Sequence, residues 1–178
     1  MCMIRATVAA AILAFSGAAF AADGKGPNLG RPATPDEIAG WDISIPPDGG
    51  NLPPGAGTAK SGAAIYAAKC ASCHGDKGVG RSAEELAGGI GSLATDNPTL
   101  SVGSYWPYAT TLFDYVRRAM PPPAPLSLSN DDVYAVCAYV LFLNGLIGED
   151  EALTATTLPK IKMPNRDGFI SIYHEPKK

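Results

Sequence analysis

The chain is poor in residues that bind metals or carry catalytic chemistry: its 178 residues include only two histidines, four cysteines and four methionines. Charged residues make up 17% of it and the formal net charge is −3, so its composition gives no reason to expect nucleic-acid binding. It also lacks an uninterrupted apolar run of the roughly 20 residues that a membrane-spanning helix needs. A hydrophobic content of 46% nevertheless indicates a globular protein, and 20 glycines and 16 prolines indicate many loops.

The first residues are typical of an export signal. Arg5 precedes an apolar run at 6–15, and the small residues Ala19 and Ala21 are placed for cleavage after residue 21. We therefore expect residues 1–21 to be a signal peptide that is cleaved on export, and the mature protein to be periplasmic. The apolar run is too short for stable insertion in a membrane.

Cleavage would leave three cysteines, Cys70, Cys73 and Cys137, and an odd number does not favour a framework of disulfides. Two of them belong to the sequence CASCH at 70–74, which is the C-x-x-C-H pattern that attaches c-type haem. Each thiol can form a thioether with one haem vinyl group, and His74 is then placed to bind the iron. The spacing predicts one covalently attached haem c.

Two other interpretations of the cysteine pair fit the sequence less well. A thioredoxin-like redox pair needs a βαβ frame, and no strand-like alternation surrounds residues 69–80. A structural zinc site needs four converging ligands, whereas Cys137 and His174 are far apart and show no ligand spacing. Cys137 is instead expected to pack as a small apolar residue of the last helix.

A second iron ligand is expected at Met120. A helical pattern over 109–119 ends just before it, and the prolines at 121–123 hold the following chain extended. Such a stiff loop suits a ligand that must keep its place. The alternatives are Met163, in a tail with no clear helix after it, and His174, close to the C-terminus. With both axial positions filled the iron would have no place for a substrate, so we expect an electron relay without catalytic residues.

Three helices are expected around the haem. They start at Thr58 or Ser61, at residue 109, and at Ser129, with Asp132 three positions further on as a capping box. The first helix runs into the C-x-x-C-H motif, and its small residues allow another helix to approach closely. The last helix carries apolar residues on one face.

The order of helix, C-x-x-C-H, glycine-rich loop, middle helix, methionine loop and terminal helix makes residues 58–146 resemble a class I cytochrome c domain. The resemblance implies an all-α fold in which the first and last helices cross near the haem, with Gly62 permitting the contact. The sequence LAGG at 86–89 resembles a family segment whose proline carbonyl orients the axial histidine. Glu84 stands where that proline would be, and a backbone carbonyl could still serve there.

Three further stretches, at 29–55, 103–121 and 158–169, are similar to monohaem cytochromes of bacterial sulfur oxidation. Those proteins accompany periplasmic molybdenum enzymes, either sulfite dehydrogenase or the sulfur dehydrogenase of thiosulfate oxidation. The resemblance implies that this chain accepts electrons from such a dehydrogenase and passes them to a downstream cytochrome c or terminal oxidase. The alternatives are a general soluble carrier without a fixed partner, and a haem enzyme or sensor with a labile axial ligand.

The predicted organisation is a signal peptide at 1–21, a Pro/Gly-rich arm at 22–57, the cytochrome c domain at 58–146 and a C-terminal extension at 147–178. The arm, with Trp41 as an anchor, could pack on its own domain or wrap a partner.

Basic residues near the haem-bearing segments could ring an exposed haem edge and steer an acidic partner, or belong to an ordinary mixed surface. They are Lys60, Lys69, Lys77, Arg81, Arg117 and Arg118. Tyr105 and Trp106 are candidates for hydrogen bonds to the haem propionates, or else core aromatics.

Overall fold

The computed structural model describes residues 29–170, so the predicted signal peptide and His174 lie outside the described residues. The described residues divide into two units, 29–40 and 41–170. Within 29–170, none of the helices has the length and hydropathy of a membrane span.

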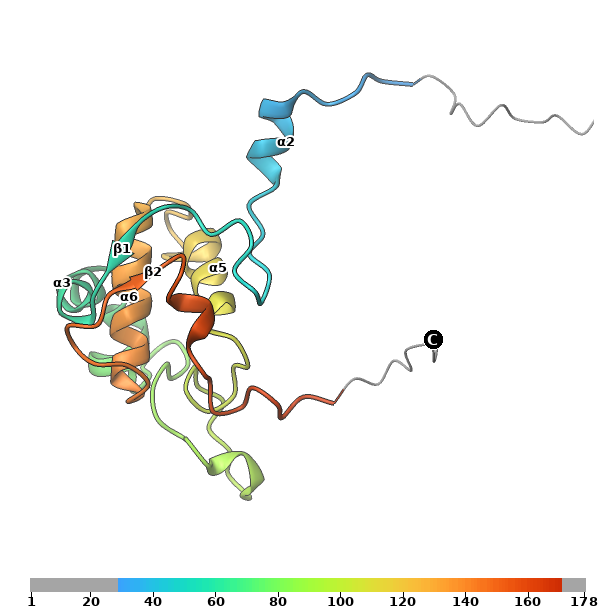
Figure 1. Ribbon diagram of the computed structural model, residues 1–178. Coiled ribbons are helices and arrows are strands. Elements are labelled where there is room, and N and C mark those ends of the chain that lie inside the picture. The colour runs from blue at the N-terminus through green and yellow to red at the C-terminus, as the bar shows by residue number, and fades with distance from the viewer. Residues whose placement is uncertain (1–28, 171–178) are drawn as a thin grey trace, which may run out of the picture. The chain divides into compact units, whose positions relative to one another are not determined.

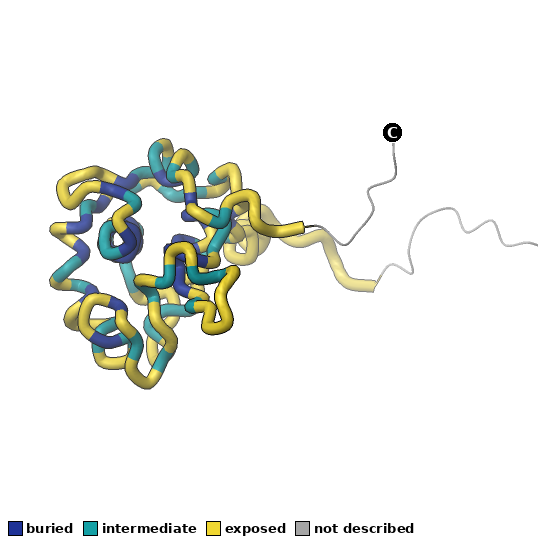
Figure 2. The backbone as a smooth tube through the Cα atoms, turned by 90° about the horizontal axis from the view of Figure 1, so that it is seen from below, coloured by how far each residue is buried: buried dark blue, intermediate teal, exposed yellow. Residues whose placement is uncertain are grey.

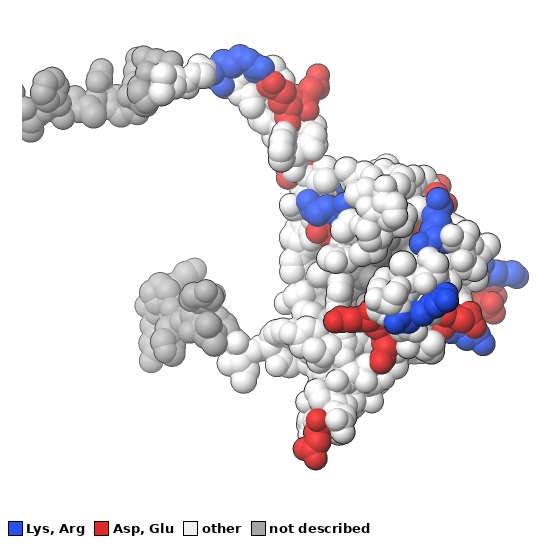
Figure 3. Space-filling view, turned by 180° about the vertical axis from the view of Figure 1, so that it is seen from behind, with Lys and Arg blue, Asp and Glu red and all other residues white. Residues whose placement is uncertain are grey.

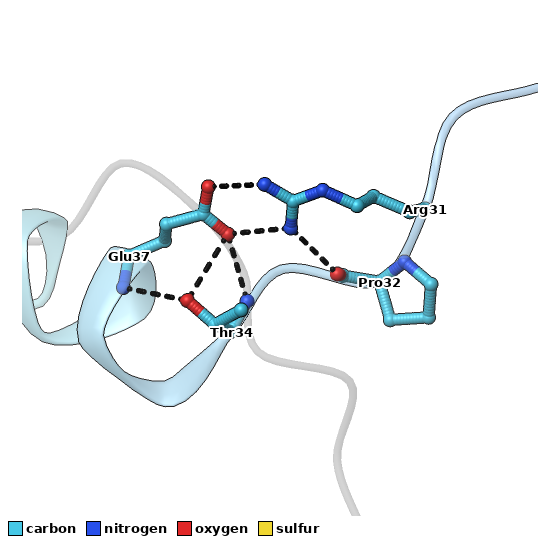
Figure 4. A network of polar contacts seen from close by, with 4 residues as sticks. All are labelled: Arg31, Pro32, Thr34 and Glu37. Carbon is cyan, nitrogen blue, oxygen red and sulfur yellow. Dashed lines mark hydrogen bonds and ion pairs between the residues drawn. The ribbon is translucent and has the colours of Figure 1, made fainter.

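Helix α2 (Pro35–Trp41) has no buried residue, and the whole stretch from 29 to 42 is exposed (Figure 2). Its N-terminus is closed by a reciprocal cap. The Glu37 N–H donates to the Thr34 hydroxyl at 3.3 Å, and the Thr34 N–H donates to the Glu37 carboxylate at 2.8 Å. Arg31 adds two hydrogen bonds to the same carboxylate, at 2.8 and 2.6 Å (Figure 4). These bonds, with Arg31 the larger cause, lower the pKa of Glu37 to about 2.

The second unit is helical, as predicted (Figure 1). Its helices are α3 (Ala59–Lys69), α4 (Ala71–His74), α5 (Ala109–Ala119) and α6 (Asn130–Leu143), with short 3₁₀ turns η1 (Asp76–Gly78), η2 (Ser92–Ala94) and η3 (Leu158–Lys160). Strands β1 (Ala56–Gly57) and β2 (Leu153–Thr154) form one antiparallel pair. Helix α5 has the limits that the sequence predicted.

The predicted caps of α3 and α6 are confirmed. Thr58 accepts a hydrogen bond from the Ser61 N–H at 3.2 Å, and Ser129 accepts one from the Asp132 N–H at 3.1 Å. Both helices have complete capping boxes, so each starts where a side chain satisfies the unpaired N–H groups of the first turn.

Helices α3 and α6 cross, with α3 seen nearly end-on beside the long axis of α6 in Figure 1. Gly62 lies at the contact, where an added Cβ would overlap the backbone carbonyl of Ala135. The predicted need for a small residue at this position is therefore confirmed. Helix α5 packs on the other side of α6, where the Phe113 and Tyr134 rings lie 4.5 Å apart.

The core extends beyond these helices into both flanking segments. Ile45 from the N-terminal side, and Leu153, Leu158 and Met163 from the C-terminal side, are all buried in it. Trp41, which we expected to anchor the arm, is instead 88% exposed.

Backbone and side-chain hydrogen bonds hold the segment after α2 to the helices. The Asp114 carboxylate accepts from the Ile45 N–H at 3.0 Å and pairs with Arg118 at 2.5 Å. The Tyr134 hydroxyl donates to the Pro53 carbonyl at 2.9 Å. The limits of the predicted domain stay a prediction, but residues on both sides of 58–146 stabilise its core.

Candidate functional site

The four predicted site residues, Cys70, Cys73, His74 and Met120, line a single cavity of about 550 Å³ in the second unit. A pocket of this size is typical for a small-molecule cofactor. Residues from four parts of the fold complete its wall: Tyr66 from α3, Leu100, Val102 and Trp106 from the loop before α5, Tyr115 and Val116 from α5, and Val136 and Val140 from α6. Most of these side chains are apolar, so the cavity suits a flat cofactor with a largely apolar face.

The two motif cysteines lie at the junction of α3 and α4. Neither forms a disulfide; Cys70 is half-buried and Cys73 is exposed. Burial raises the pKa of the Cys70 thiol. The only strands of the described residues are the two-residue pair β1–β2, so the frame of a thioredoxin-like site is not found in 29–170.

The zinc interpretation likewise gains no support, because the described part of the chain has no cluster of three metal-binding Cys, His, Asp or Glu side chains. Cys137 lies in the apolar core of α6 with no exposed surface, and this burial raises its pKa. The prediction that Cys137 packs as an apolar residue is confirmed.

A backbone carbonyl holds the His74 ring. Nδ1 of His74 lies 2.8 Å from the carbonyl oxygen of Glu84. Because a carbonyl oxygen can only accept, Nδ1 must carry the proton, and Nε2 is left with the lone pair that a metal needs. The residue that replaces the expected proline therefore supplies the carbonyl.

The chain around His74 is fixed by further hydrogen bonds. The His74 carbonyl accepts from the Gly80 N–H at 2.7 Å, and the Cys73 carbonyl accepts from the Ala83 N–H at 2.9 Å. The Tyr66 hydroxyl donates to the carbonyl of Gly75 at 3.0 Å. Burial raises the pKa of Tyr66 to about 12, so it stays a hydrogen-bond donor at neutral pH. The sequence motifs give no signal for this role of Tyr66, because its partner is a backbone carbonyl.

Met120 directly follows α5, and its N–H donates to the Val116 carbonyl at 3.0 Å. The prolines at 121–123 continue along the cavity wall. Met163, the alternative ligand within the described residues, is 1% exposed in the core and does not line the cavity. The structure therefore brings Met120, and not Met163, together with the C-x-x-C-H motif.

Charges of both signs surround the cavity. Of the six basic residues near the haem-bearing segments, Lys69 alone lines the cavity. The acidic residues Glu84 and Glu85 also line it. Arg118 is paired with Asp114, and positive and negative groups lie close together on the face shown in Figure 3. This distribution favours an ordinary mixed surface over a basic ring.

The two candidate aromatic residues for the cofactor's polar edge are separated by the structure. Trp106 lines the cavity and meets the Tyr115 ring edge-on at 5.8 Å. Tyr105 does not line it and packs on Phe169 at 5.2 Å. Of these two aromatic residues, Trp106 is therefore the one placed to contact a molecule in the cavity.

Comparison with known proteins agrees with this geometry. Residues 57–140 match the family described as cytochrome C oxidase, cbb3-type, subunit III. A chain in the crystal structure of the sulfane dehydrogenase SoxCD from Paracoccus pantotrophus is 46% identical, with a TM-score of 0.78, over 81% of this chain and 71% of that chain. A search of curated proteins gives no match. The structural match spans about 144 residues (81% of 178), more than the predicted domain at 58–146 contains, so it includes flanking segments.

Proposed function

Because this chain belongs to the c-type cytochrome family, we propose that it is the one-haem electron-transfer partner of a molybdenum-dependent sulfane dehydrogenase. Its fold is that of a class I cytochrome c, as the sequence predicted, and it is an electron-transfer haem protein. The observation that carries the proposal is the convergence of two cysteines, a histidine and a methionine on one apolar cavity.

In this proposal Cys70 and Cys73 attach the haem through thioethers, and His74 and Met120 bind the iron. The bound haem supplies one-electron exchange between ferric and ferrous iron. The Glu84 carbonyl keeps the His74 ring in one tautomer and one orientation. The apolar wall limits the access of water, which favours a stable carrier.

The residues near Met120 support a fixed ligand more than a labile one. Its N–H is bonded to the preceding helical turn, and the prolines after it have restricted backbones. A haem enzyme or sensor would need the iron to release this ligand. With His74 and Met120 both bound, the protein would have no substrate position at the iron, so the dehydrogenase would carry out the chemistry on sulfur.

The relationship to the SoxCD chain favours a sulfane dehydrogenase over a sulfite dehydrogenase as the electron donor. The protein would then pass electrons to a downstream cytochrome c or a terminal oxidase. We place it in the periplasm, after removal of residues 1–21, because their pattern is that of a signal peptide.

The segment 29–41 is proposed to contact the dehydrogenase. Its apolar side chains Leu29, Ile38 and Trp41 are 86%, 52% and 88% exposed. A seven-residue helix is marginal on its own, yet α2 is held by its cap and by the pair of Arg31 with Glu37 (Figure 4). A helix formed in advance loses less conformational entropy on binding.

Stopped-flow kinetics under anaerobic conditions test the donor. Ferric protein is mixed with a sulfane-sulfur substrate and catalytic amounts of the molybdenum subunit of a sulfane dehydrogenase, and in parallel with sulfite and a sulfite dehydrogenase. The proposal expects fast, saturable reduction only with the first pair, and none when the enzyme is omitted. Equal rates with both enzymes would support a general carrier, and reduction by neither would reject the proposed donor.

A further inference from the structure

Asn144, at the C-terminal end of α6, makes three hydrogen bonds with its side chain. Oδ1 accepts from the Gly88 N–H at 3.0 Å, and Nδ2 donates to the carbonyls of Leu86 at 3.0 Å and Val140 at 2.9 Å. The side chain is buried but is not among those that line the cavity. Two of the three bonds therefore reach a loop that lies 56 to 58 residues away in the sequence.

The surroundings of the Asn144 amide are fitted to it. A Cβ added at Gly103 would overlap the Asn144 side chain, so the glycine leaves the space that the amide occupies. Ser101, two residues earlier, donates from its hydroxyl to the Gly88 carbonyl at 2.6 Å. Gly88 is thus held through its N–H by Asn144 and through its carbonyl by Ser101.

The loop that Asn144 holds also contains the carbonyl that orients His74. Glu84 lies two residues before Leu86, and Leu86 itself lines the cavity. We propose that Asn144 is a positioning residue for the axial histidine: it holds the loop 84–88 so that the Glu84 carbonyl stays 2.8 Å from Nδ1 of His74. This inference rests on the proposed function, in which His74 binds the haem iron.

The consequence for the iron follows from the hydrogen bond at Nδ1. A strong acceptor at Nδ1–H makes Nε2 a better electron donor, and a better donor favours the ferric state. Loss of the Asn144 bonds would loosen the loop and weaken the bond between His74 and Glu84. The reduction potential should therefore rise.

The test compares three variants of the haem-loaded protein with the wild type. Asn144→Leu keeps the approximate size of the side chain and removes all three hydrogen bonds. Gly103→Ala keeps the amide but displaces it. Tyr134→Phe is the matched control, because it removes one hydrogen bond from the same helix, to Pro53, away from the loop. The readouts are the reduction potential, the NMR shifts of the His74 ring, hydrogen exchange at the Gly88 amide, and the melting temperature.

Asn144→Leu is expected to raise the potential, to shift the His74 ring signals and to speed Gly88 exchange about tenfold, as loss of one hydrogen bond implies. Gly103→Ala should change each readout in the same direction by less. Tyr134→Phe should lower the melting temperature and leave the other three unchanged. If Asn144→Leu does not retain haem, Asn144→Ser takes its place with the same criteria.

An unchanged potential and unchanged His74 signals in a folded Asn144 variant would overturn the inference and leave Asn144 a purely structural residue. A wild-type protein without a low-spin, histidine-ligated haem spectrum would be a different result. It would reject the proposed function, and the inference with it.

Discussion

Replacing Gly62 with alanine should destabilise the protein, although helix propensity alone predicts the opposite. Alanine is about 1 kcal/mol more favourable than glycine inside a helix. In this fold, however, the new Cβ would overlap the backbone carbonyl of Ala135 in α6. A backbone group cannot rotate away as a side-chain tip can, so the two helices must separate, at a cost of about 1–3 kcal/mol. Taking the upper part of that range, we expect a net loss of about 1–2 kcal/mol.

Thermal unfolding of the haem-loaded protein, followed by circular dichroism, measures this loss as a melting temperature lowered by about 2–8 °C, because a chain of this size loses about 2–4 °C per kcal/mol. Gly148→Ala is the matched control, because its new Cβ would approach only the Glu151 Cβ, at 4.0 Å. That control should change stability by no more than about 0.5 kcal/mol. The haem absorption spectrum should also change in Gly62→Ala, because α3 and α6 both form walls of the cavity.

A Gly62→Ala protein at least as stable as the wild type would refute this reasoning. It would mean that α6 can move away without loss of packing, or that propensity outweighs the contact. Whether Gly62→Ala raises or lowers the stability therefore shows whether helix propensity or the contact with α6 dominates at this position.

Three further predictions concern the site, the core and the arm. Met120→Ala should give a high-spin or water-ligated haem spectrum while Met163→Leu leaves the spectrum unchanged, and an unaltered Met120→Ala spectrum would support a different axial ligand. Burial raises the pKa of Tyr134 from 10.0 to about 12, so the folded state binds this proton more tightly than the unfolded chain. The stability that this proton contributes is fully present below pH 10 and is lost as the pH rises towards 12. Urea titrations over this range should therefore show a smaller fall in the free energy of unfolding for Tyr134→Phe than for the wild type. Deleting residues 23–40 should weaken binding to the dehydrogenase in a titration without changing the haem spectrum; unchanged affinity would exclude residues 23–40 from the docking surface.

The helices near the site could be predicted because their signals are local. A capping box acts within one turn, so Thr58 with Ser61 and Ser129 with Asp132 mark helix starts without knowledge of the fold. The prolines after Met120 mark an end in the same way. The placement of the four predicted site residues on one cavity also followed from the order of these elements.

The packing of the flanking segments could not be predicted in this way. The bond from Ile45 to Asp114 joins residues 69 positions apart, and the strand pair joins the segment before α3 to the segment after α6. Neither contact leaves a periodic pattern in the sequence. For this reason Trp41 was a plausible anchor from its size, while the smaller Ile45 is the residue that is buried.

The orientation of His74 shows a deeper limit, because the groups that control it are backbone atoms. The carbonyl at residue 84 accepts a hydrogen bond from Nδ1 of His74, although the side chain there is glutamate and not the expected proline. Asn144 in turn holds the neighbouring loop through the Gly88 N–H and the Leu86 carbonyl. A motif of side chains therefore identifies the ligands, but their geometry depends on loop backbone whose position only the folded chain defines. Substitutions in the loop that keep its backbone path should consequently be tolerated more readily than substitutions of Asn144.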